Sequence, residues 1–270
     1  MTLDTNVVGN LYIPTDVAVT SAIWNGTNIL DTENVLTING KDYYVLTVEI
    51  APKYGNLAAT ITVNLENGLA VDFAFSVERY AKALFALDGS ANEYVKDSQT
   101  MMKYVLTYIK EVAVKFGGAD EATLFAGIDY AVDTKIEVTE EAKDTSAIKD
   151  YVTHAALNLD AYAGFAFKVA KDFVGTIRLE MRGVPTIEKT YTAEAPAGED
   201  EVIVLENVPA YLFRGDVTIT VTTADATATA QFNLATYMKN NGEAYTVALY
   251  AYSTEAAKYN AKYPTVNTVK

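Results

Sequence analysis

The sequence predicts a mainly β protein of the α+β class. We expect two tandem β-sandwich domains, Ig-like or jelly-roll-like, each with packed C-terminal helices. Three observations predict this fold: a segment of short strands occurs twice, each copy leads into a Tyr-bearing helix, and half of the 270 residues are apolar. A chain of this length suits two domains that each bury a core.

The internal repeat is visible when the chain is aligned with itself. Residues 42–63 align without a gap with residues 200–221, and Thr60-Ile61-Thr62-Val63 is identical to Thr218-Ile219-Thr220-Val221. Such a tetrapeptide is common in strands, so the shared order of strand, strand, short helix and Tyr-bearing helix is the stronger signal. The period is too long for a solenoid unit and indicates two domains of similar fold.

Turn signals divide the first copy into short β segments. Asn25-Gly26, Asn39-Gly40 and Asn67-Gly68 each stand between apolar runs. Asn-Gly is the strongest short-range signal for a tight β-hairpin. These positions therefore predict a meander-like arrangement of antiparallel strands.

Helices are predicted at the end of each copy. Ser76 is a candidate N-cap, a longer helix is expected over residues 92–116, and Gly117-Gly118 supplies its stop. A last helix is expected over residues 243–263, before Pro264. Aromatic residues recur at helical spacing on both long helices, and we interpret these stripes as core.

These elements define the expected domain organisation. The region between the two copies carries the charge run Glu140–Asp144 but no proline and no Gly-Ser stretch. This composition favours two packed halves over two freely strung ones. We expect repeat 1 over residues 1–118, a linker over residues 119–149, repeat 2 over residues 150–264 and a tail over residues 265–270.

Charge and composition argue against several classes of protein. The net charge is −14 and the isoelectric point about 4.5, which disfavours binding to nucleic acid or to anionic membrane through a basic patch. Cysteine is absent, which excludes disulfides and thiol chemistry. No apolar run reaches the roughly 18–20 residues that span a bilayer, so we expect no membrane insertion. The first residues lack a signal peptide, which fits either an intracellular protein or a mature region cut from a longer precursor.

No catalytic, metal or cofactor site is expected. His154 is the only histidine, and no nucleophile-elbow signature stands near it. The acidic turns at residues 120–121 and 198–201 do not match a calcium-binding loop. No Gly-rich phosphate loop opens a helix. We therefore expect a protein that is not an enzyme and needs no cofactor.

Aromatic side chains are the remaining candidates for a binding site. Tyrosine outnumbers phenylalanine by 19 to 10, and tyrosine is favoured at binding surfaces. Sugars stack on exposed aromatic rings with a polar edge. The alternative is that these rings only cover strands and helices. The candidate ligand-binding residues are Trp24, Tyr43, Tyr44, Tyr54 and Tyr211.

Several short motifs resemble a repeated module of large secreted proteins from gut Firmicutes. The motifs are residues 75–80, residues 232–237, Val247–Tyr252 with Ala256-Ala257, and Ala155–Asp160. The first copy departs from the pattern at Ile109-Lys110-Glu111, where the family has small residues. The resemblance implies export, a secreted or cell-surface setting and neighbouring modules in a longer polypeptide. It supplies no catalytic residue.

Three classes of function follow. The first is a non-catalytic extracellular binding or adhesion module for a polysaccharide or another surface protein. The second is a structural spacer or assembly component of a cell wall, fibre or virion surface, for which self-association is an expected property. An enzyme is third. A free strand edge or a large apolar patch would favour the second class.

Overall fold

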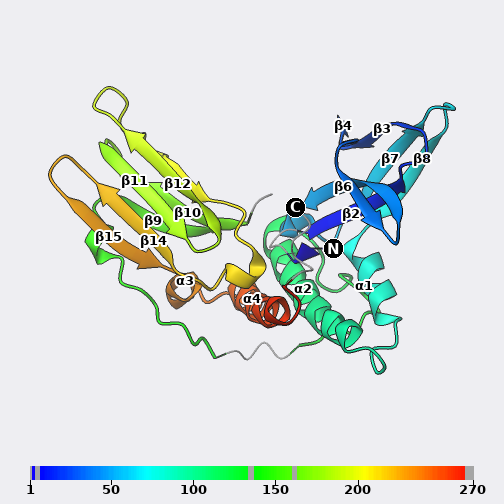
Figure 1. Ribbon diagram of the computed structural model, residues 1–270. Helices are drawn as coiled ribbons and strands as arrows, with labels where there is room; N and C mark the ends of the chain where they lie inside the picture. The colour runs from blue at the N-terminus through cyan, green and yellow to red at the C-terminus, as the bar shows by residue number, and fades with distance from the viewer. Residues whose placement is uncertain (1, 4–6, 133–136, 160–162, 265–270) are drawn as a thin grey trace.

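The computed structural model describes residues 2–3, 7–132, 137–159 and 163–264 (Figure 1). The described residues form four antiparallel sheets and four α-helices, which confirms the predicted mainly β, α+β class. The sheets lie in two pairs, one at each end of the molecule, with helices between them.

The N-terminal half contains two four-stranded sheets. Six buried residues from both sheets form one apolar cluster, so the sheets pack face to face. That cluster consists of Ile13, Ala22, Leu46, Val48, Ile61 and Val63. One sheet has the order β1 (Thr2–Leu3), β2 (Val7–Pro14), β6 (Lys41–Ile50), β5 (Val35–Ile38), and the other β4 (Thr27–Asn28), β3 (Val19–Trp24), β7 (Ala59–Leu65), β8 (Ala70–Phe75).

The C-terminal half repeats this hydrogen-bonding pattern. Its sheets have the strand orders β9-β10-β13 and β12-β11-β14-β15, which match β1-β2-β6 and β4-β3-β7-β8. Strand β5 has no counterpart among the described residues. The internal repeat is therefore present in strand order. The strands are β9 (Val152–Asn158), β10 (Gly164–Val169), β11 (Gly175–Met181), β12 (Val184–Tyr191), β13 (Val202–Leu205), β14 (Val217–Thr222) and β15 (Thr227–Phe232).

The equivalent strands β6 and β13 correct the gapless alignment of the two copies. That alignment places Leu46 opposite Val204, but Leu46 is fully buried and Val204 is not. In β13 the residues of the apolar core are its neighbours, Ile203 and Leu205, whereas in β6 the residues of the core between the sheets are Leu46 and Val48. Val45 is buried too but belongs to neither cluster. Because side chains alternate between the faces of a strand, the two copies correspond one residue out of step here.

Two of the predicted hairpin turns need left-handed backbone. Asn25 and Gly26 have φ of 49° and 79°, and Asn39 and Gly40 have φ of 52° and 78°. Both central residues of each turn are thus in the region that asparagine and glycine tolerate best. The Asn-Gly signals at these two positions are confirmed.

The helices begin and end close to the predicted positions. Ser76 caps the first, since its hydroxyl oxygen accepts from the amide of Arg79 at 3.1 Å. Gly118, with φ of 67°, ends the second. The α-helices are α1 (Val77–Phe85), α2 (Glu93–Gly117), α3 (Leu234–Asn240) and α4 (Ala244–Lys262), and the 3-10 turns are η1 (Pro52–Tyr54), η2 (Ser146–Ile148) and η3 (Ala210–Leu212).

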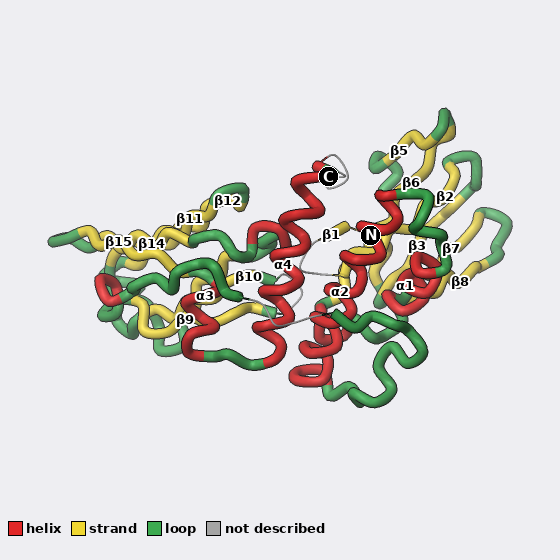
Figure 2. Tube along the Cα trace, turned by 90° about the horizontal axis from the view of Figure 1, so that it is seen from below, coloured by secondary structure: helices red, strands yellow, loops and turns green. Residues whose placement is uncertain are grey.

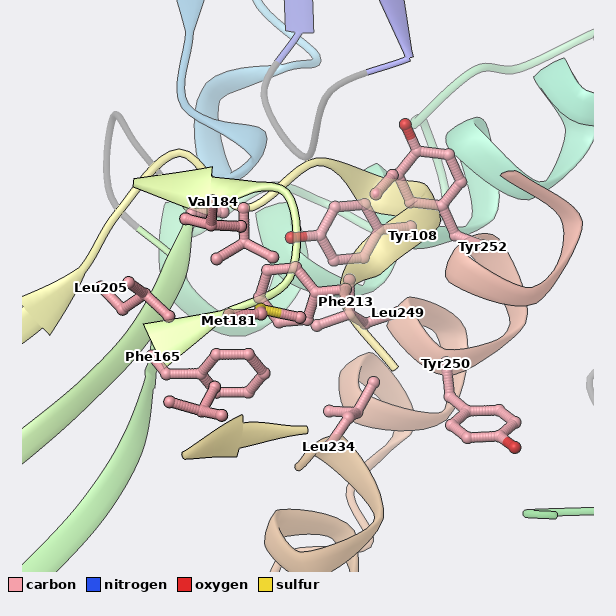
Figure 3. Packing of buried hydrophobic residues seen from close by; sticks show 14 of the residues in the cluster. Tyr108, Phe165, Met181, Val184, Leu205, Phe213, Leu234, Leu249, Tyr250 and Tyr252 are labelled. Atoms are coloured by element: carbon pink, nitrogen blue, oxygen red, sulfur yellow. The ribbon is translucent and has the colours of Figure 1, made fainter. Parts of the chain in front are cut away.

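Helices α2 and α4 form an antiparallel pair between the halves (Figures 1 and 2). Tyr108 and Tyr252 stack at the centre of the pair, with ring centroids 5.5 Å apart. Phe116 meets Tyr245 at one end, with centroids 5.1 Å apart. A single core cluster includes residues of both halves, and Tyr108 and Tyr252 lie beside Phe213 and Leu249 within it (Figure 3).

Residues 139–151, here called the covering segment, follow the surface of the C-terminal half before β9 begins. The amide of Thr139 donates to the Tyr250 hydroxyl at 2.9 Å, and the amide of Lys143 donates to Thr236 Oγ1 at 2.8 Å. Further along, η2 packs against β15 and buries Ile148. The later part of the expected linker is thus packed against the C-terminal half.

Two tyrosines on these helices predict opposite effects of the same substitution. The Tyr108 hydroxyl is buried without a hydrogen-bond partner among the described residues, and burial raises its pKa. Tyr108→Phe should leave stability unchanged or raise it by about 1 kcal/mol, since an unpaired buried polar group costs about 1–3 kcal/mol. Tyr250→Phe removes a hydrogen bond to the Glu140 carboxylate and should cost about 1.5–3 kcal/mol.

Thermal and denaturant unfolding of both variants measure this difference. At about 2–4 °C per kcal/mol, the two melting temperatures should diverge by several degrees. Equal losses in both variants would mean that the Tyr108 hydroxyl has a partner.

Candidate functional site

Trp24 lies on the inward face of its sheet. It follows Ala22 at a spacing of two in β3, is half-buried and contacts both core clusters. Ala22 pairs with Val63 as Ile177 pairs with the equivalent Val221, so the position that corresponds to Trp24 is the fully buried Leu179. Much of the Trp24 ring therefore serves the packing of the N-terminal half.

The other predicted aromatics lie apart from Trp24. Tyr43 and Tyr44 are consecutive near the start of β6, where they pair with Pro14 and Ile13 at the end of β2. A short connection leads from there to Val19, the first residue of β3, whereas Trp24 is the last residue of that strand. Tyr54 lies in η1 and is 47% exposed. Tyr211 lies half-buried in η3, the equivalent turn of the other half. The five candidates thus do not form one flat platform, and only Tyr43 and Tyr44 adjoin.

His154 borders a cavity of about 370 Å³ in the C-terminal half. The histidine is exposed on β9, and Lys149, Tyr237 and Asn240 are also in the wall. The described residues contain no group of three or more His, Asp or Glu side chains that could hold a metal ion. Within the same residues, no helix has the length and apolar character needed to cross a membrane.

The most connected polar cluster joins the covering segment to α4. Arg214 Nε donates to Glu140 Oε1 at 2.8 Å, and a second guanidinium nitrogen, Nη2, donates to the same carboxylate. The Tyr250 hydroxyl donates to Glu140 Oε2, and the guanidinium lies 5.0 Å from the Tyr250 ring centroid. Arg214 Nη1 also donates to Thr254 Oγ1 at 2.9 Å. These bonds are internal, so the cluster fastens the covering segment in place.

The protonation of Glu140 reflects these contacts. Burial by itself would raise the pKa of the Glu140 carboxyl, but hydrogen bonds from Arg214 and Tyr250 outweigh it and leave the pKa below its ordinary value. Glu140 is therefore ionised at neutral pH. The sequence placed this residue in a solvated charge run, because its partners come from elements far along the chain.

A second cavity, of about 420 Å³, opens between the two halves. Lys53 and Phe116 line it from the N-terminal half, and Tyr237 and Tyr245 from the other. The two tyrosine hydroxyls are hydrogen-bonded at 2.9 Å. The sequence did not reveal this cavity, since only the packing of α2 against α4 brings its walls together.

A third cavity, of about 300 Å³, lies in the N-terminal half between β2 and β8. Phe73 and Phe75 of β8 form one wall, and Gly9 and Leu11 of β2 form the other. Arg79 of α1 stands at one end. Of its wall residues, Phe73 is also exposed to solvent, as are Leu69 and Val71 on the same face earlier in the chain.

Comparison with known proteins identifies no relative of this chain. No protein-family model matches the chain, and neither the curated proteins nor the solved structures include a significant match. The geometry described above therefore carries the functional argument.

Glu140→Gln tests the polar cluster by its pH dependence. Because the folded pKa lies below the ordinary value of 4.5, ionised Glu140 stabilises the fold above that value. The contribution is lost as the pH falls through the folded pKa. At neutral pH we expect the variant to be less stable by about 1.5–3 kcal/mol, the range for hydrogen bonds to a charged group.

Denaturant unfolding of both proteins between pH 7 and pH 2 measures the effect. The difference in free energy of unfolding should shrink below the ordinary pKa and close in strong acid. The control is Glu206→Gln, an exposed residue, which should match the wild type at neutral pH. A difference that stays constant with pH would contradict the assignment.

Proposed function

We propose that this protein is a non-catalytic surface or assembly module that holds two binding units in a fixed relative orientation. Each half would be a β-sandwich domain of Ig-like or jelly-roll-like type, and the shared strand order supports this interpretation. The observation that carries the proposal is the antiparallel packing of α2 against α4, which places residues of both halves in one core cluster.

The helix pair has contacts along its whole length. Beyond the Tyr108–Tyr252 stack, Tyr263 meets Tyr94 at 5.1 Å between ring centroids at one end. There Lys262 Nζ also lies 2.6 Å from Asp97 Oδ2. Exposed ion pairs contribute little each, so the buried apolar and aromatic contacts supply most of the energy. Helices held in this way favour a spacer of fixed geometry over two loosely linked domains.

A secreted or cell-surface setting fits this role. The resemblance to modules of large secreted proteins implies export and neighbouring modules in a longer polypeptide. The acidic, cysteine-free composition suits a soluble surface of this kind. The partner would be another surface protein or another component of an extracellular assembly.

Distance measurements between the halves test the fixed orientation. The chain has no cysteine, so Thr60→Cys in β7 and Gln231→Cys in β15 give one spin label in each half. Pulsed electron–electron double resonance between the two labels should yield one narrow distance distribution. Tyr252→Ala removes the stack on Tyr108, at about 3–5 kcal/mol for a buried aromatic, and should broaden the distribution.

The matched control is Tyr12→Ala, which truncates an exposed tyrosine of β2, outside the helix pair, and should leave the distribution narrow. Circular dichroism checks that every variant keeps its secondary structure. A broad distribution in the otherwise wild-type protein would overturn the proposal.

A polysaccharide ligand is the second candidate. It is favoured by the exposed ring of Tyr54, next to Lys53 in the wall of the cavity between the halves. The Lys53 ammonium group lies 5.4 Å from the Tyr54 ring centroid. An exposed ring beside a cavity with tyrosine hydroxyls offers a stacking surface and hydrogen-bond donors for a sugar.

Glycan-array and insoluble-polysaccharide binding test this candidate. Tyr54→Ala should weaken binding at least tenfold, since it removes the stacking surface without disturbing the core. Trp24→Ala is the less clean variant, because Trp24 contacts both core clusters and its loss also perturbs the fold. Absence of binding by the wild-type protein would leave the assembly role alone.

A further inference from the structure

One side of the N-terminal half is open between two strand edges. Strand β1 pairs only with Val7 and Val8, so from Gly9 to Pro14 the outer edge of β2 has no strand partner among the described residues. Strand β8 is the edge of the other sheet. The cavity of about 300 Å³ lies between these two edges.

Large apolar side chains at this opening point inward. Val71 and Phe73 pair with the buried residues Val63 and Ile61, so they lie on the same face as the core. Phe73 is nevertheless 39% exposed, whereas the equivalent residue of β15, Ala230, is 6% exposed. Large apolar residues that face inward without cover mark a contact surface.

The C-terminal half shows what covers the same place. There β9 pairs with β10 along its full length, and η2 of the covering segment packs against β15. Ile148 of η2 is fully buried. The Lys143 amide is held by Thr236 Oγ1 of α3. In the C-terminal half, one extended segment thus lies over this place and forms the outer wall of the 370 Å³ cavity.

The two openings share part of their walls. Pairing registers and burial match four wall residues of the 300 Å³ cavity with four of the 370 Å³ cavity that His154 borders. The residue at the end of each cavity is the second residue after the start of its helix, α1 or α3. The matched pairs are Leu11 and Phe167, Ile61 and Ile219, Phe75 and Phe232, and Arg79 and Thr236.

We propose that the open side of the N-terminal half binds an extended segment of another polypeptide chain. This donor segment runs antiparallel to β2, adds a strand to its edge at Gly9–Tyr12, and inserts an aliphatic side chain between β2 and β8. Strand addition gives affinity through backbone hydrogen bonds, and side-chain pockets give specificity. The inference does not depend on the fixed orientation of the halves, so the two proposals fail separately.

The donor segment has a definite chemistry. Its anchor is an aliphatic residue in the role of Ile148, because the inward-facing residues Ile61, Phe73 and Phe75 line the cavity. The polar residues of the lining are Asn10, Asp72 and Arg79, and the Asp72 carboxylate already accepts a hydrogen bond from Thr62. Upstream, at the position of Lys143, it carries an acidic residue, because the N-terminal half presents the Arg79 guanidinium where the other half presents the Thr236 hydroxyl.

A synthetic peptide of residues 143–158, added to the full chain, is the probe. Calorimetry and amide chemical shifts should show binding with shifts at β2 and β8. Ile148→Asp in the peptide should weaken binding at least tenfold, since it places a charge in an apolar cavity. Lys143→Glu in the peptide should strengthen it several-fold through Arg79. Absence of binding by all three peptides would overturn the proposal.

Cross-linking tests the register. Asn10 corresponds to Ala166, whose partner in β9 is Ala156. Because the chain has no cysteine, the substitution Asn10→Cys gives the protein a single thiol, and a second substitution gives the peptide one. A peptide with Ala156→Cys should form the disulfide faster than one with Ala155→Cys, which is one residue out of register and projects to the opposite face. Equal rates would contradict strand addition.

Two protein variants locate the site. Phe73→Glu should abolish peptide binding, whereas Val202→Glu on β13, 43% exposed, should not change it. Equal losses in both variants would overturn the assignment. Sedimentation of the wild-type protein separates the other occupant: self-association that Phe73→Glu abolishes, without affinity for any peptide, would mean that a second copy covers this face instead of a donor strand.

Discussion

The rest of this structure depends on the antiparallel packing of α2 against α4. At the centre of that packing, the rings of Tyr108 and Tyr252 are stacked. Each helix packs on the 3-10 turn of its own half, η1 for α2 and η3 for α4. The position of each pair of sheets is therefore fixed by its helix. Joining the helices joins the halves, and the cavity between them exists only because of this contact.

The two copies of the repeat differ in what lies over the space between their sheets. In the C-terminal half, the covering segment packs against β15 beside β9, and Glu140 fastens it through Arg214 and Tyr250. In the N-terminal half, the equivalent space is open and its wall has larger apolar side chains, such as Phe73 in place of Ala230. An apolar surface without cover costs free energy unless a partner binds, which is why the open side suggests an interface.

The ligand-binding residues predicted from the sequence differ in their exposure and in where they lie in the structure. Tyr54 is exposed as a ligand-binding ring requires, but Trp24 shares its ring between two core clusters. Tyr43 and Tyr44 lie at the other end of the strands. Aromatic residue type identifies a side chain that can stack on a ligand. Which face of the strand it occupies depends on register, and a single residue of shift reverses it.

The sequence by itself determined the local structure of this protein. Asn25-Gly26 and Asn39-Gly40 required hairpins, Ser76 and Gly118 bounded helices, and the repeated motifs implied two similar halves, because these signals act through nearby backbone geometry. Only the tertiary structure decided that α2 and α4 pair, that Glu140 is bound by Arg214, and that one half is covered while the other is open. Those outcomes depend on contacts between residues far apart in the chain, for which spacing and composition carry no signal.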